Sequence, residues 1–311
     1  PPSQAELETL RSIAFRRGLT LHLPVSDLPP GEQWMRKGYE HGPRLFEKDG
    51  LVMTPPTDDR PFFFQVLSPL RPIDAQVAQR AGVNAEGVIA LQQLMLVMTG
   101  LTVLLFFAPF PLKRWLAPQP GFWRGCVFFT CIGLAFMFVE IAWLQRFILY
   151  LGHPSLATTV ALGCILLGAG LGSMTSERVG VRQGGRLGFV LPLAVGIVNA
   201  LLGPLFTTTL GLPWAARLAL AIVTITPTGF LMGFFFPLGM VRFGERGRAW
   251  FWALNGAAGV LASVVSLALS MELGFSTVAY AGAVIYVLAW LLLRGAPPEP
   301  AAEAEPAPAE A

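Results

Sequence analysis

Seven long apolar stretches fill most of the chain after residue 87, and they constrain its fold more than any other feature. A helix needs about 20 apolar residues to cross a hydrocarbon core of about 30 Å, and each stretch is long enough. Because backbone polar groups inside lipid must be satisfied within their own segment, we expect each stretch to be a helix. The sequence therefore predicts a mainly α, polytopic helical membrane protein with about six or seven transmembrane helices. The expected helices cover residues 88–108, 125–151, 156–174, 187–206, 215–241, 250–271 and 275–293.

The composition agrees with this class, because 54% of the residues are hydrophobic and 13% are charged. A soluble domain carries about 25% charged residues. We expect the lipid bilayer as a partner and no nucleic acid. The histidines and cysteines lack the spacing of a metal site, so no metal is expected. The cysteines lie in apolar runs and are interpreted as packing residues; they are Cys126, Cys131 and Cys164.

Residues 1–87 carry most of the acidic side chains and have a different pattern. Ser3 and Glu6 form a capping-box pattern, and apolar residues then recur at helical spacing up to Gly18. Alternating apolar and polar residues in 19–25 predict a short strand. A helix followed by a strand is half of an α/β unit, but so few large apolar side chains cannot bury a stable core alone.

Basic residues in the loops indicate how the helices are oriented. They alternate between connections that carry several and connections that carry none, and the positive-inside rule assigns the basic loops and the carboxy-terminal tail to the cytoplasm. The tail, residues 295–311, contains Pro, Ala and Glu without aromatic residues and is expected to be disordered. The basic residues that set the pattern are Lys113, Arg114, Arg124, Arg178, Arg182, Arg186, Arg242, Arg246, Arg248 and Arg294.

The run PPTDDRPFFF begins at Pro55 and precedes the first apolar stretch. Asp58 and Asp59 can accept turn hydrogen bonds, and Arg60 can form a charge-assisted pair with either carboxylate. The residues favour a structural turn, with a substrate-binding segment as the alternative. The phenylalanines at 62–64 then suggest a last strand or an aromatic anchor near the bilayer.

This run resembles the carboxy-terminal end of the Rossmann-type domain in bacterial membrane-integrated spermidine synthase-like proteins, also described as fused transporter-like/spermidine synthase or class I methyltransferase-like proteins. Residues 133–154, 166–173, 229–240 and 252–264 are similar to the membrane signatures of that family. The residues that match its soluble motif are Thr57, Asp58, Asp59, Arg60 and Pro61.

The resemblance implies four parts in a multi-pass protein of the bacterial inner membrane. Residues 1–67 would be the α/β remnant of the spermidine synthase/methyltransferase-like domain, 68–87 a linker, 88–294 the helical membrane domain and 295–311 the tail. The full-length parent would use decarboxylated S-adenosylmethionine or S-adenosylmethionine. Because no glycine-rich turn follows a strand in residues 1–87, we expect this chain to bind no cofactor and to be catalytically incomplete. No catalytic residue is assigned.

Polar side chains at bilayer depth are costly and are candidate functional residues. Glu140 lies near the middle of its stretch without a cation one turn away, so any partner must come from another helix or from water. It would be a proton- or amine-binding carboxylate, or a hydrogen-bonded structural residue. Asn199 and Asn255 would contact a ligand or join helices through hydrogen bonds. Gln145 is expected near the membrane interface, where the neighbouring Arg146 would extend toward water.

Small residues at four-residue spacing let helices approach closely. Pro227 and Pro237 are expected to bend the fifth stretch, and transporters bind substrates at broken helices, although proline kinks also occur without such a role. The candidates for close helix packing are Gly168, Gly172, Gly259 and Ser263.

Two functions from different classes fit these patterns. In the first, the helices hold an aminopropyltransferase-like or methyltransferase-like enzyme at the membrane. In the second, they form a transporter-like module for polyamines or other amines, with a degenerate soluble attachment. Seven crossings would put residues 1–87 outside the cell, yet an adenosyl cofactor is made in the cytoplasm. We therefore expect a cytoplasmic remnant, with a first apolar segment that does not fully cross and six crossings from Gly125 onward.

Overall fold

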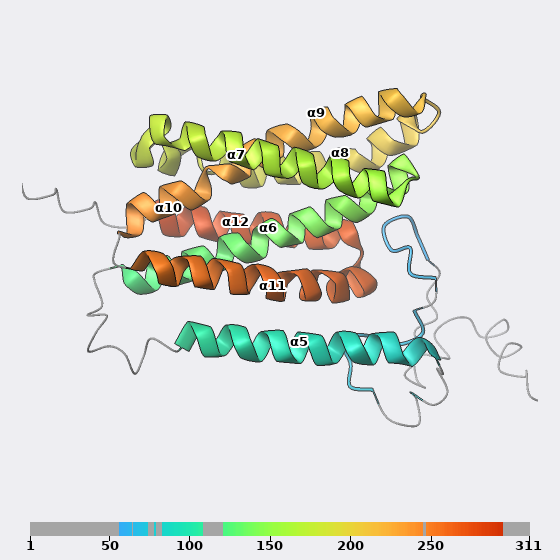
Figure 1. Ribbon diagram of the computed structural model, residues 1–311. Helices are drawn as coiled ribbons and strands as arrows, with labels where there is room; N and C mark the ends of the chain where they lie inside the picture. Colours follow the sequence, from blue (N-terminus) through green and yellow to red (C-terminus); the bar gives the residue numbers. More distant parts are fainter. Residues whose placement is uncertain are drawn as a thin grey trace, which may run out of the picture. The chain divides into compact units, whose positions relative to one another are not determined.

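A computed structural model of the chain describes residues 56–63, 65–73, 78, 83–107, 121–244 and 247–294. Within them lie eight helices and no strand, labelled α5 to α12 in Figure 1. The helix expected at 3–18, the strand at 19–25 and the tail at 295–311 fall outside the described residues, as does most of the expected α/β remnant. The helices are α5 (Val83–Phe107), α6 (Phe122–Leu151), α7 (Pro154–Leu187), α8 (Val190–Thr209), α9 (Trp214–Gly233), α10 (Phe235–Phe243), α11 (Arg248–Leu273) and α12 (Phe275–Arg294).

Seven candidate spans occur in the described part of the chain, judged by length and composition, with α9 and α10 together forming one. The prediction of a polytopic helical membrane protein is confirmed at this level. Helix α5 is uninterrupted over 25 residues and is long and apolar enough to cross, so the expectation that it does not fully cross stays a prediction. Its side chains are mostly exposed, with Leu96 at 75%, as expected for a helix that faces lipid.

The core is built around α6, which packs against α7, α9, α10, α11 and α12. Near its start, Phe129 stacks on Phe251 of α11 with ring centroids 4.8 Å apart, and Phe128 stacks on Phe235 of α10 at 6.4 Å. Between helices in lipid, this kind of close packing replaces the hydrophobic effect as the stabilising term. The same core contains three free, buried cysteines, in agreement with their interpretation as packing residues: Cys126, Cys131 and Cys164.

Glycines bring the backbones of α7 and α9 into contact. A side-chain carbon at Gly168 would lie 2.5 Å from the carbonyl oxygen of Thr226, and one at Gly172 would overlap the carbonyl oxygen of Phe230. No larger residue fits at either position without moving a helix. The small-residue pair of α7 therefore defines a close helix interface.

The fifth span is divided, and Figure 1 shows α9 and α10 as separate helices. The break lies at Phe234, between the end of α9 at Gly233 and the start of α10 at Phe235. Pro237 has no N–H to donate to the carbonyl of Gly233, and its ring crowds that carbonyl, so one helical hydrogen bond is lost. Bonding resumes at once, with the Leu238 N–H donating to the Phe234 carbonyl at 3.2 Å. Pro227 lies inside α9 without ending it.

Two compact units divide the chain, and residues 57–62 belong to the unit that contains the helices from residue 90 onward. The other unit includes residues 63–89. In its described part Leu67 and Ser68 are buried. The Ser68 hydroxyl accepts a hydrogen bond from the backbone N–H of Leu70 at 3.3 Å, which closes a short turn.

Candidate functional site

Residues 57–62, which we call the DDR turn, form a tight turn within the helical unit. The backbone N–H of Thr57 donates to the carbonyl of Arg60 at 3.2 Å, and the N–H of Arg60 donates to the carbonyl of Thr57 at 2.9 Å. Asp58 and Asp59 occupy the tip, where aspartate is common because its side chain can accept local hydrogen bonds. The motif thus forms the structural turn that its residues favoured.

Asp59 caps the amino terminus of α12. Its Oδ1 accepts hydrogen bonds from the backbone N–H of Ser276 at 2.9 Å and from the Ser276 hydroxyl at 2.7 Å. Its backbone carbonyl accepts a third bond, from the N–H of Phe275 at 2.9 Å. The first N–H groups of a helix have no partner within the helix, and a negative charge there also interacts favourably with the helix dipole.

Arg60 binds the preceding helix end. Its Nη1 donates to the carbonyl of Glu272 at 3.2 Å, one of the last carbonyls of α11, which lack partners within the helix. The ring of Phe62 packs on that of Phe275 with centroids 5.6 Å apart, so this phenylalanine is an anchor on the helices. Consecutive residues of the DDR turn therefore hold the end of α11 and the start of α12 together.

Arg146 points into the helical unit, so the expectation that it extends toward water is wrong. The residue is only 9% exposed. Its Nη1 donates to the side-chain oxygen of Asn199 at 2.9 Å and to the Asn199 carbonyl at 3.3 Å. Asn199 in turn donates from Nδ2 to the carbonyl of Ser276 at 3.0 Å. These bonds join α6, α8 and α12, and Ser276 links them to Asp59 of the DDR turn.

An aromatic pair holds this arginine in place from the side. Tyr150 and Phe206 stack with centroids 4.2 Å apart and planes 10° from parallel. The guanidinium of Arg146 lies 5.9 Å from the ring of Phe206, and that of Arg217 lies 5.8 Å from the ring of Tyr150. Arg217 also donates from Nη1 to the carbonyl of Tyr150 at 2.7 Å, near the end of α6. The four groups form a stack of two cations around two rings.

A cavity of about 420 Å³, which we call the end cavity, lies between the DDR turn and this stack. Both carboxylates of the turn line it, and so does Arg146. No ion pair joins these charges in the described residues, although the Asp59 carboxylate attracts the guanidinium electrostatically. The cavity is lined by Asp58, Asp59, Arg146, Leu149, Tyr150, Gly203, Phe206, Thr207, Leu210 and Ser276.

The opposite end of the same helices is basic. Helix α12 has 20 residues, so its two ends lie about 30 Å apart at 1.5 Å per residue. At its carboxy-terminal end a cavity of about 490 Å³ is lined by four arginines. We call this the arginine end, and its cavity is lined by Val181, Arg182, Gly185, Arg186, Arg242, Leu293 and Arg294.

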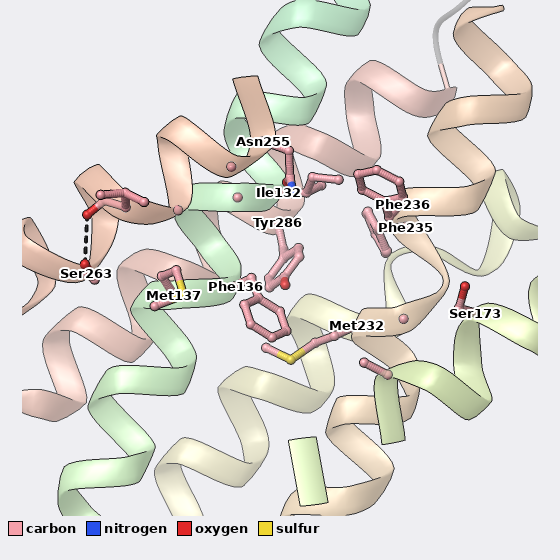
Figure 2. Close-up of a pocket in the computed structure, with 16 residues that line it drawn as sticks. Ile132, Phe136, Met137, Ser173, Met232, Phe235, Phe236, Asn255, Ser263 and Tyr286 are labelled. Atoms are coloured by element: carbon pink, nitrogen blue, oxygen red, sulfur yellow. Dashed lines mark hydrogen bonds between the residues drawn. The ribbon is translucent and has the colours of Figure 1, made fainter. Parts of the chain in front are cut away.

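A third cavity, of about 550 Å³, lies between helices beside the break at Phe234, and we call it the central cavity. Figure 2 shows the rings of Phe136, Phe235 and Tyr286 around it, with the Tyr286 hydroxyl turned toward it. Its lining is mainly apolar and contains no charged side chain. The lining residues are Ile132, Gly133, Phe136, Met137, Ala169, Ser173, Met232, Gly233, Phe235, Phe236, Asn255, Gly256, Gly259, Val260, Ser263 and Tyr286.

Glu140 is buried in α6, 7% exposed, and no hydrogen bond or ion pair reaches it from the described residues. It follows Phe136 and Met137 of the central cavity by one helical turn and interacts electrostatically with Tyr286. The hydroxyl of Ser266 on α11 is also buried without a hydrogen-bond partner in the described part of the chain. The carboxylate thus has the isolation that the sequence indicated.

The other predicted polar and packing residues separate into two groups. Asn255, Gly259 and Ser263 of α11 all line the central cavity. These residues, which were expected to mediate helix contacts, therefore also border the cavity. Ser263 donates to the carbonyl of Val260 in its own helix at 2.8 Å, drawn as a dashed line in Figure 2. Gln145 is half-buried and lines none of the three cavities.

No packing role was assigned to Gly229 and Gly233 from the sequence, and Ser276 was not identified as the partner of Asp59. Gly229 and Gly233 repeat on α9 the spacing of the glycine pair of α7, and a side-chain carbon at Gly229 would lie 2.7 Å from the carbonyl of Ile165. That spacing was visible in the sequence. Ser276, which binds Asp59, had no such signal, because a serine at the start of an apolar helix is common.

No known protein family, curated protein or solved structure matches this chain. In the described part of the chain no group of three or more His, Cys, Asp or Glu side chains could hold a metal ion. The candidate sites are therefore the DDR turn with the end cavity, and the central cavity beside Glu140.

Proposed function

We propose that this chain is the membrane-embedded carboxy-terminal part of a spermidine synthase-like protein, in which the helices hold the preceding domain at the bilayer. The DDR turn supports this proposal, because it carries the resemblance and is bonded to the helices. Asp59 binds Ser276 across 217 positions of sequence, and Arg60 binds Glu272 across 212. In the proposed protein, the segment that leaves the preceding domain is fixed to helices encoded far downstream.

In this proposal the chain holds the preceding domain at the bilayer. Group transfer is carried out by upstream residues of the full-length parent. Decarboxylated S-adenosylmethionine or S-adenosylmethionine would bind there, on a glycine-rich turn that residues 1–87 do not contain. Calorimetry of purified residues 1–311 is expected to give no saturable binding of either cofactor, whereas the parent should bind one. Saturable binding by residues 1–311, or a parent that neither binds a cofactor nor transfers an aminopropyl or methyl group, would contradict this proposal.

The orientation that follows from charge puts the arginine end in the cytoplasm of the bacterial inner membrane, together with the tail. The DDR turn then lies on the outer side, at the opposite end of α12. This orientation conflicts with the cytoplasmic position expected from the cofactor, which stays a prediction. Because adenosyl cofactors are made in the cytoplasm, an outer position weighs against catalysis by the parent and for the second function below.

A second function, a transporter-like module for polyamines or other amines, is supported by the central cavity. Broken helices expose backbone groups in the middle of a membrane protein, and the break at Phe234 borders this cavity. Aromatic faces attract organic ammonium groups, and Phe136, Phe235 and Tyr286 surround the space. Glu140, one turn away without a described partner, would supply the countercharge.

Uptake of labelled putrescine and spermidine into proteoliposomes tests this function. Glu140→Gln should insert and fold normally but lose uptake, because the amide keeps the shape and removes the charge. Gln145→Asn, at a half-buried position away from the cavities, is the matched control and should keep uptake. If Glu140→Gln retains full uptake while Glu140→Leu prevents expression, Glu140 is a structural residue and the transporter proposal loses its main support.

A further inference from the structure

The end cavity contains opposite charges that do not neutralise each other directly. Arg146 lines it from α6, and Asp58 and Asp59 line it from the DDR turn, yet no ion pair connects them in the described residues. A cavity of about 420 Å³ separates groups that would otherwise attract each other into contact. An occupant with one negative and one positive group would satisfy both sides at once.

Arg146 is fixed and still has free donors. Only its Nη1 is engaged by the described residues, through the two bonds to Asn199. Its remaining N–H groups have no described partner, although the residue is only 9% exposed. A guanidinium held in this way presents paired donors that match the oxygens of a phosphate. Thr207 also lines the cavity, but its hydroxyl donates to the carbonyls of Gly203 and Pro204 in its own helix.

The acidic side of the cavity suits a primary ammonium. Asp58 is exposed at the tip of the turn and accepts no hydrogen bond from the described residues, whereas Oδ1 of Asp59 is occupied by Ser276. A free carboxylate beside a second one favours a cation that donates hydrogen bonds. A polyamine, which is positive throughout, would instead be repelled by the buried guanidinium on the other wall.

The cavity lies at the ends of candidate membrane spans, where lipid headgroups are expected. Its lining comes from the last turns of α6 and α8, and the stacked ring of Tyr150 is of the type enriched at membrane interfaces. Two residues of the rim face outward from these helices, Leu149 at 47% exposure and Leu210 at 58%. These leucines provide an apolar surface for an acyl chain next to a polar pocket.

From these features we infer that the end cavity binds a zwitterion made of a phosphate and a primary ammonium, as in the headgroup of phosphatidylethanolamine. The phosphate accepts hydrogen bonds from Arg146, and the ammonium donates to Asp58. The same group occurs free in solution as phosphoethanolamine. Binding of this kind is independent of the anchoring and transport roles proposed above, because it uses neither an adenosyl cofactor nor the central cavity.

Lipid binding to the full chain, purified in detergent and delipidated, tests the inference by native mass spectrometry. Phosphatidylethanolamine is compared with phosphatidylcholine of the same acyl chains, because both carry the phosphate but only the first has an ammonium that donates hydrogen bonds. We expect a preference of about fivefold for phosphatidylethanolamine, the size of one charge-assisted hydrogen bond near a surface. Equal binding of the two lipids, as expected for a cavity filled with water, overturns the inference.

Variants separate this cavity from other lipid contacts. Asp58→Asn changes an exposed side chain without described hydrogen bonds, so it should fold normally and reduce the preference to about twofold or less. Arg146→Lys keeps the buried charge but loses the paired donors, and it should weaken binding of both lipids. Glu177→Gln, an exposed carboxylate on α7, and Arg182→Gln at the arginine end should leave the preference unchanged. A preference that survives Asp58→Asn in full rejects the site.

A second experiment with soluble headgroups decides whether the occupant is a membrane lipid or a free solute. Phosphoethanolamine and phosphocholine are titrated into the chain by calorimetry. If phosphoethanolamine binds and Asp58→Asn removes that binding, the site takes the free solute. If only the lipid binds with the dependence on Asp58, the acyl chain on Leu149 and Leu210 contributes, and the occupant is a membrane lipid.

Discussion

The two ends of the helical unit differ in how their charges are used. At the arginine end, four arginines line one cavity and no acidic residue lines it with them. At the opposite end, Asp59 and Arg60 bind helix termini, and a buried arginine shares a cavity with two carboxylates. By the positive-inside rule, charge at the arginine end would set the orientation through its sum. Charge at the DDR end acts through individual hydrogen bonds. The first use tolerates changes of position and the second does not.

The largest expected effect concerns the sides of the membrane on which the two ends lie. In a background without Cys126, Cys131 and Cys164, a cysteine replacing Thr208 or Asp58 at the DDR end should react completely with an impermeant thiol reagent in intact cells. A cysteine replacing Gln183, an exposed residue between arginines of α7, should react only after permeabilisation. The positive-inside rule gives this all-or-none difference. Reaction of Asp58→Cys only after permeabilisation would instead return the DDR turn to the cytoplasm.

The next effect tests the close contact between α7 and α9 at Gly168 and Gly172. Gly172→Leu puts a side chain into the carbonyl of Phe230, so we expect loss of at least about 3 kcal/mol of the free energy of unfolding and little monodisperse protein. Gly170→Leu is the control, because a side chain at that position meets open space. Size-exclusion chromatography and thermal unfolding in detergent measure both. Equal stability of the two variants would show that α7 and α9 do not approach this closely.

A smaller effect is expected at the cap of α12. Asp59→Ala removes an oxygen that accepts two hydrogen bonds from Ser276, and it should lower the free energy of unfolding by about 2 kcal/mol. Asp58→Ala, one residue earlier and without described hydrogen bonds, should cost less than about 0.5 kcal/mol. Thermal unfolding of the two variants in the same detergent gives the comparison. A larger loss for Asp58→Ala would reverse the roles assigned to the two carboxylates.

The smallest effect compares one arginine at each end of the helical unit. Arg60 makes a specific hydrogen bond, whereas Arg178 contributes only to the total charge. Arg60→Met removes the donor to Glu272 at 3.2 Å while keeping an unbranched side chain, and it should lower the free energy of unfolding by about 1 kcal/mol. Arg178→Met at the other end should leave it unchanged within error, because that side chain is exposed and has no described partner. Similar losses for both variants would mean that arginines at the two ends contribute in the same way.

The sequence by itself determined the spans, because hydropathy and helix length are local properties. Residues 125–151 were expected to form a helix and α6 covers Phe122–Leu151, and residues 275–293 agree with α12 within one residue. A bend in the fifth span was also expected from Pro227 and Pro237; α9 continues through Pro227, and the break lies just before Pro237. The third stretch was predicted too short, since 156–174 was expected and α7 covers Pro154–Leu187.

The tertiary structure alone decided what the polar side chains do. Asp59 was visible as a turn residue, but its partner Ser276 lies 217 positions away, and no local pattern links the two. Arg146 was expected to reach water because it lies near a helix end, whereas Asn199, 53 positions away, offers it a buried acceptor. Glu140 was recognised as isolated from its own helix, and only the packing of α6 could tell whether another helix supplies a partner. Hydropathy is a sum over neighbours in sequence, whereas a hydrogen bond depends on two atoms that folding brings together.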